Sequence, residues 1–115
     1  MKLLASLAAL VLCSGAALAQ GVHSGSWQPL GCAPLPSMAT AAFLSSVGIP
    51  QGATLADIQV SSQNVNYRDD GVAPTATLGL TIFAGTSWLP YSGNLASLQL
   101  IQTASAATGF VCFYK

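Results

Sequence analysis

The sequence predicts an all-β domain, an antiparallel β-sandwich or jelly-roll-like barrel of about seven short strands behind an apolar N-terminal segment. Apolar and polar side chains alternate in several segments, most clearly in residues 54–61, as in strands with one buried face. Clusters of Gly, Pro, Asn and Ser that favour turns recur about every ten residues. Charged residues make up only 5% of the chain and none is Glu, so surface helices with ion-paired faces are not expected.

Residues 1–19 form the apolar N-terminal segment. Lys2 is followed by an apolar run that ends in Ala-Leu-Ala at Ala19, which is the pattern of a signal peptide cleaved after Ala19. The run is short for a membrane span. Cleavage would place the mature protein in the periplasm or outside the cell. The alternative is an uncleaved apolar arm buried in a partner subunit, and a membrane contact is expected only through this segment.

Residues 20–37 are expected to be an irregular leader, because Pro34 and Pro36 restrict the backbone on both sides of Leu35. The leader contains His23, the one histidine of the chain, which we expect to be a solvated loop residue. The remaining residues, 38–115, are enough for one domain and are assigned to the sandwich.

The first part of that domain has one ambiguous segment and one clear strand. Residues 38–47 fit a helix or a strand, and the strands that follow favour a strand. Residues 54–61 predict a strand whose buried face is formed by Ala56, Ile58 and Val60.

The second part predicts five further strands. The turn Asp69-Asp70-Gly71 joins the first two of them, and Gly71 permits a positive φ there. Pro90 places its own strand at a sheet edge. The five segments are residues 62–68, 75–84, 88–91, 95–102 and 110–114.

Two cysteines remain once the signal peptide is removed, Cys32 and Cys112. An even number of cysteines in an exported chain indicates a disulfide, which would tie the start of the mature domain to its last strand. Two separate buried thiols are the alternative, because pairing requires a short Cβ separation.

The sequence shows no set of catalytic residues, so an enzyme and a cofactor are not expected. Asp69 and Asp70 are adjacent, and in an extended segment their side chains point apart, which is unfavourable for paired acid–base chemistry. The two carboxylates could contribute to a Ca²⁺ site, but the chain has no EF-hand pattern, and no metal site is predicted. A net charge of about zero gives no electrostatic basis for binding nucleic acid, and no small-molecule substrate is indicated.

Two groups of residues are candidates for other roles. Residues Tyr67, Arg68, Asp69, Asp70 and Gly71 are interpreted as a structural anchor, in which Arg68 pairs with a neighbouring carboxylate or caps backbone carbonyls. The aromatic residues Trp88, Tyr91 and Tyr114 are candidates for an interface or a ligand site. Together with Phe110 and Phe113 they could form a platform for sugar rings, although aromatic residues at strand spacing are more commonly core or interface.

The charged turn also carries a resemblance to known proteins. The chain reads Tyr-Arg-Asp-Asp-Gly at 67–71, Pro-Thr at 74–75, Ala-Gly at 84–85, Tyr-Ser-Gly-Asn-Leu at 91–95 and Phe-Tyr at 113–114. This series resembles a pattern in small, mostly uncharacterised structural proteins of tailed bacteriophages and prophages. The resemblance covers about residues 53–114, and it implies a β-sandwich virion or prophage-encoded structural protein without assigned catalytic residues.

We therefore expect a non-enzymatic structural or assembly module that acts by packing against copies of itself or against other virion or envelope subunits. If residues 1–19 are retained, the expected location is the virion. The alternative is an exported cell-envelope module that binds a glycan or another surface ligand.

Overall fold

The computed structural model describes residues 26–85 and 88–115, so the predicted signal peptide and His23 lie outside the described residues. Within these described residues, eight strands and two short 3₁₀ helices follow one another. The strands are β1 (Pro29–Pro34), β2 (Ala42–Phe43), β3 (Leu55–Ser61), β4 (Val65–Arg68), β5 (Leu80–Ile82), β6 (Trp88–Tyr91), β7 (Gln99–Gln102) and β8 (Thr108–Tyr114), and the helices are η1 (Leu44–Val47) and η2 (Leu95–Ser97).

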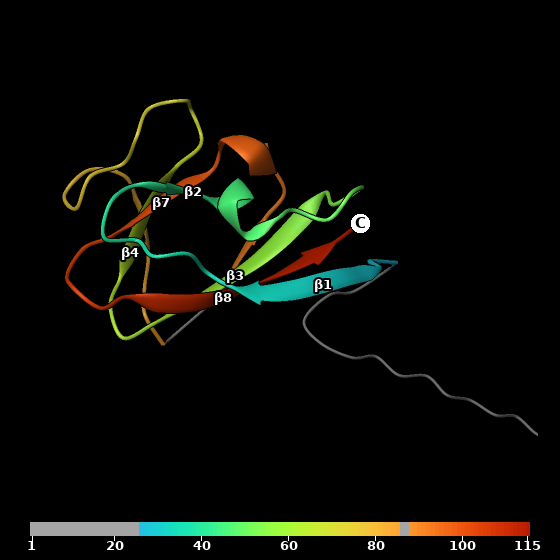
Figure 1. Ribbon diagram of the computed structural model, residues 1–115, viewed down its shortest axis with the longest axis horizontal. Coiled ribbons are helices and arrows are strands. Elements are labelled where there is room, and N and C mark those ends of the chain that lie inside the picture. The colour runs from blue at the N-terminus through green and yellow to red at the C-terminus, as the bar shows by residue number, and fades with distance from the viewer. Residues whose placement is uncertain (1–25, 86–87) are drawn as a thin grey trace, which may run out of the picture.

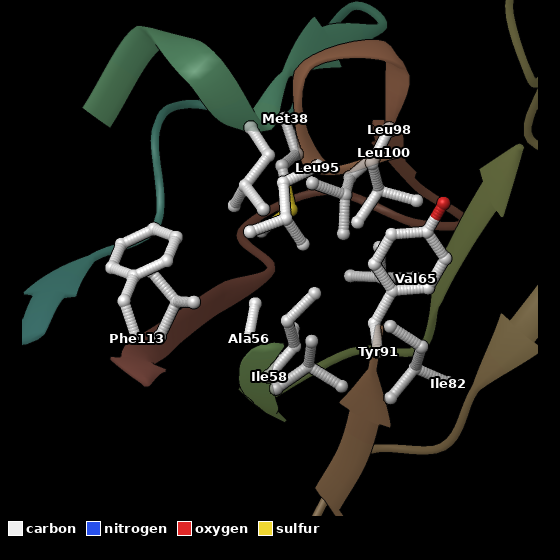
Figure 2. Close-up of a cluster of buried hydrophobic side chains, with 13 residues drawn as sticks. Met38, Ala56, Ile58, Val65, Ile82, Tyr91, Leu95, Leu98, Leu100 and Phe113 are labelled. Atoms are coloured by element: carbon white, nitrogen blue, oxygen red, sulfur yellow. The ribbon is translucent and has the colours of Figure 1, made fainter. Parts of the chain in front are cut away.

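The strands form two four-stranded antiparallel sheets, which confirms the predicted β-sandwich class (Figure 1). Sheet A has the order β1-β8-β3-β6 and sheet B the order β2-β7-β4-β5. The core between the sheets is a cluster of buried apolar side chains (Figure 2). As predicted, Ala56, Ile58 and Val60 on β3 are fully buried in it. The alternating pattern therefore identified the core face of the central strand β3.

The predicted irregular leader is only partly irregular. Residues Pro29–Pro34 form β1, which pairs with β8 at one edge of sheet A. The prolines indicated loop, but a strand at a sheet edge needs only one row of hydrogen bonds, so proline is tolerated there. The sandwich therefore begins before residue 38, and this boundary of the prediction was wrong.

The ambiguous segment 38–47 is mostly not a strand. Only Ala42–Phe43 pairs, as β2 with β7, and the chain then turns into η1. Ser46 donates its hydroxyl to the carbonyl of Phe43 at 2.7 Å, a local bond of the kind that competes with strand pairing. Gly48 ends the helix with a φ of 80°, a conformation that glycine adopts without steric cost. The tight turn lets Leu44 enter the core.

The predicted strand at 75–84 is shorter than expected. Its first residues form a turn in which Thr75 and Leu78 exchange backbone hydrogen bonds of 2.9 and 3.2 Å. The hydroxyl oxygen of Thr75 also accepts from the amide of Leu78 at 3.0 Å, so a side chain satisfies the backbone in place of a sheet partner. Pairing begins only at Leu80, where β5 joins β4.

The predicted strand at 95–102 is a strand only in its second half. Residues 95–102 divide into η2 and β7, because the carboxamide oxygen of Asn94 accepts from the amide of Ala96 and starts a helical turn. The strand that contains Pro90 is β6, and it lies at the edge of sheet A as predicted.

Candidate functional site

The five residues predicted as a structural anchor span the end of β4, with Tyr67 and Arg68, and the turn that follows it, with Asp69, Asp70 and Gly71. Gly71 has a φ of 84°, which confirms the positive φ expected at this position. Asp70 accepts a hydrogen bond from the amide of Val72 at 3.2 Å, so its side chain shapes the turn. The turn also lines an open hollow of about 300 Å³ together with Gly79 and Leu80.

Arg68 pairs with Asp70 inside this turn. The guanidinium donates to both carboxylate oxygens, from Nε to Oδ1 at 3.0 Å and from Nη2 to Oδ2. The hydrogen bond from Arg68 holds the pKa of Asp70 below its usual value, and the same bond raises the pKa of Arg68. Both side chains are substantially exposed, at 32% and 51%. Water screens such a pair, so its contribution to stability is small.

Asp69 connects the turn to sheet A. Its Oδ2 accepts a hydrogen bond of 2.6 Å from the hydroxyl of Tyr91, which lies on β6. Tyr91 is only 8% exposed, and its ring meets that of Tyr67 edge to face with centroids 6.4 Å apart. Burial, followed by the hydrogen bond to Asp69, raises the pKa of Tyr91 far above its usual value of 10.0. The strongest link between the turn and the core therefore passes through Asp69 and not through Arg68.

Tyr91 is also held in place by the chain that follows it. A Cβ atom on Gly93 would lie 2.4 Å from the hydroxyl oxygen of Tyr91, so only glycine leaves room for the ring. Tyr91 was a candidate interface or ligand residue, and the structure places its ring in the core.

Asn66 is a structural residue that the sequence did not single out. It is only 4% exposed, and its amide nitrogen donates to the carbonyl of Thr75 at 3.0 Å. Its carbonyl oxygen accepts from the hydroxyl of Thr81 at 2.7 Å. Asn66 thus holds the loop of residues 71–79 against sheet B. An asparagine beside an apolar strand residue gives no signal of this role in the sequence.

The outer face of sheet A carries two of the predicted aromatic residues. Trp88 and Tyr114 line a hollow of about 160 Å³ together with Phe110, Asp57, Gln59 and Cys112. Trp88 is 37% exposed and Phe110 is 47% exposed. Phe113, the remaining aromatic of the proposed platform, is buried in the core. The sheet therefore separates the predicted aromatic residues by face.

Cys32 and Cys112 form a disulfide between β1 and β8, where they are directly opposite each other. The predicted pairing is confirmed. A disulfide is compatible with an oxidising, exported location.

Another hollow has a volume of about 660 Å³. It is lined by residues without titratable side chains, from 45–54 and 92–96. Among the side chains of residues 26–85 and 88–115, no three His, Cys, Asp or Glu residues gather closely enough to hold a metal ion. Within the same ranges, no helix has the length and apolar character needed to cross a membrane.

No protein-family model matches the chain, and searches of curated proteins and of solved structures also find no match. The fold and the geometry of these surfaces therefore carry the functional argument.

Proposed function

We propose that this protein is a non-enzymatic assembly module, an exported or virion-associated β-sandwich that associates with a second copy of itself through the edge of sheet B formed by β5. The observation that carries the proposal is the exposure of Leu80. Leu80 lies opposite Tyr67 in the β4–β5 pair, and strand alternation places it on the same side as the buried Ile82. It is nevertheless 63% exposed.

Other large apolar side chains close to β5 in the sequence are exposed as well. Val72, Leu78 and Phe83 are 52%, 62% and 58% exposed. All three lie within residues 72–83, the part of the sequence that contains β5. Large exposed apolar side chains concentrated in one segment are typical of an interaction surface. With formal charges that cancel, two copies would not repel one another strongly.

Comparison of the four edge strands favours β5 as the point of contact. Natural sheets block edge pairing with proline, charge or very short strands. The edge strands β1 and β6 contain prolines, and β2 has only two residues. The remaining edge strand, β5, is one residue longer than β2 and reads Leu-Thr-Ile, without proline or charge. Pairing of β5 with its own copy would give an antiparallel contact about a two-fold axis.

The assembly proposal predicts that Leu80→Lys shifts the protein from dimer to monomer. A lysine at this position places a charge in the apolar contact and makes pairing unfavourable. Sedimentation velocity of wild type and variant at several concentrations measures the change.

Phe43→Lys is the matched control, because Phe43 is 48% exposed and lies on β2, at the opposite edge of sheet B. This variant is expected to sediment like wild type. A wild type that remains monomeric at all concentrations would refute the proposal, as would a loss of association caused by Phe43→Lys alone.

A further inference from the structure

The outer face of sheet A presents aromatic and polar side chains in a regular arrangement that the assembly proposal does not use. In one row across three strands, Gln59 on β3 lies between Trp88 on β6 and Phe110 on β8. In the next row, Asp57 on β3 lies beside Cys112 on β8. Tyr114 lies one row further along β8, and all six residues line the hollow of about 160 Å³.

We infer that this hollow is a binding site for a neutral saccharide, with the sugar rings against Trp88 and Phe110 and their hydroxyls toward Asp57 and Gln59. The site lies on sheet A and β5 lies in sheet B, so the inference goes beyond the proposed assembly function and does not depend on it.

The aromatic side chains supply the apolar part of such a site. Trp88 and Phe110 are separated by one intervening strand, so their backbones lie about 10 Å apart, which is two strand spacings. Both rings are exposed and lie on the outer face of sheet A. A saccharide has apolar C–H faces that pack on such rings, and an extended chain of two or more sugars would reach both of them.

The polar side chains supply the specificity. The carboxylate of Asp57 accepts hydrogen bonds, and the amide of Gln59 both donates and accepts them. Vicinal sugar hydroxyls need this combination, because each donates one hydrogen bond and accepts others. A quaternary ammonium ion would use the rings and Asp57 through cation–π and charge interactions, but it would make no use of the amide of Gln59, which lies between the two rings. The polar pair therefore favours a saccharide.

The strands beneath the hollow are held together by a disulfide and by pairing on both sides, which supports a preformed site. The Cys32–Cys112 disulfide joins β1 to β8 at the row that contains Asp57. Central strand β3 is paired on both sides. Ligand affinity is lost when groups must be ordered on binding, and a sheet cross-linked at this point limits that loss.

The experiment uses the full-length protein and three neutral probes: cellotetraose, chitotetraose and maltotetraose. Isothermal titration calorimetry and saturation-transfer NMR are expected to detect binding of at least one of them with a Kd of about 1 mM or tighter. Phe110→Ala is expected to weaken that binding about tenfold or more, and Asp57→Asn is expected to weaken it as well.

Phe43→Ala is the matched control, since Phe43 is 48% exposed compared with 47% for Phe110 but lies in sheet B. It is expected to bind like wild type, and thermal unfolding of both variants checks that they are folded. The inference is overturned if no tetrasaccharide binds, if Phe43→Ala weakens binding as much as Phe110→Ala, or if tetramethylammonium binds more tightly than every saccharide.

Discussion

Tyr91 lies where the apolar core meets the charged turn. Figure 2 shows its ring beside Val65 and Ile82, with the hydroxyl oxygen at the margin of the cluster. That position allows the ring to be buried while the hydroxyl reaches the carboxylate of Asp69. A tyrosine combines both properties in one side chain, so it can join a core to a polar loop.

At the residue scale, Tyr91→Phe is expected to lower the free energy of unfolding by about 1 to 2 kcal/mol at pH 7, because Asp69 loses a hydrogen bond and the ring remains. Urea denaturation of both proteins measures the difference. A variant as stable as wild type would show that water replaces the hydroxyl without cost.

The same pair of proteins also tests the pH dependence. In the unfolded chain Tyr91 ionises near its ordinary pKa of 10.0, whereas the folded protein, by burying the ring and bonding it to Asp69, keeps the hydroxyl protonated to higher pH. Above about pH 10 the unfolded state binds fewer protons, so wild-type stability falls as the pH rises. Stability should fall less steeply with pH for Tyr91→Phe, which lacks this hydroxyl. Some decline remains, because burial also raises the pKa of Tyr67. Equal declines in the two proteins would contradict this assignment.

At the scale of elements, the unit to explain is the β4–turn–β5 segment. Its two polar attachments differ in environment. Arg68 and Asp70 pair in the solvent, whereas Asn66 bonds to Thr75 and Thr81 while nearly fully buried. A buried hydrogen-bonding group that loses its partner lowers stability substantially. Breaking an exposed ion pair costs little, because water solvates both charges.

Asn66→Ala is therefore expected to destabilise the protein by about 1 to 3 kcal/mol, and Arg68→Ala to lower stability by less. Chemical denaturation of both variants under the same conditions gives the comparison. A larger loss for Arg68→Ala would restore the arginine as the main anchor of the turn.

At the scale of the whole molecule, the disulfide closes nearly the entire described chain, since Cys32 and Cys112 are 80 residues apart. Such a long loop has many conformations in the unfolded state, and the cross-link removes most of them. It also holds β1, an edge strand, against β8 in the middle of sheet A (Figure 1).

The double variant Cys32→Ser/Cys112→Ser is accordingly expected to lose on the order of 4 kcal/mol of unfolding free energy in the chain-entropy model. Guanidinium denaturation measures it, and wild type under reducing conditions should unfold at the same denaturant concentration as the variant. If wild type were equally stable with and without reductant, the disulfide would not stabilise the fold.

Several features could be predicted from the sequence without knowledge of how the strands pair. Alternation in residues 54–61 identified β3 and its core face, Pro90 placed β6 at an edge, and Gly71 marked the positive φ of the turn. Cys32 and Cys112, the two cysteines beyond the predicted signal peptide, indicated the disulfide. These predictions used the period of a strand, the backbone conformations open to Gly and Pro, and the number of cysteines. None of them requires knowledge of strand order.

Only the tertiary structure decided which surfaces these elements create. The burial of Asn66, the entry of residues 29–34 into sheet A and the exposure of Leu80 all follow from pairings between distant segments. The aromatic residues show the same dependence: Tyr91 faces the core, whereas Trp88, on the same strand, lies on the outer face of sheet A, as Phe110 does. Sequence determined that this chain forms strands with apolar faces, and the order and register of those strands determined which apolar side chains remained on the surface, because register assigns every side chain to one face.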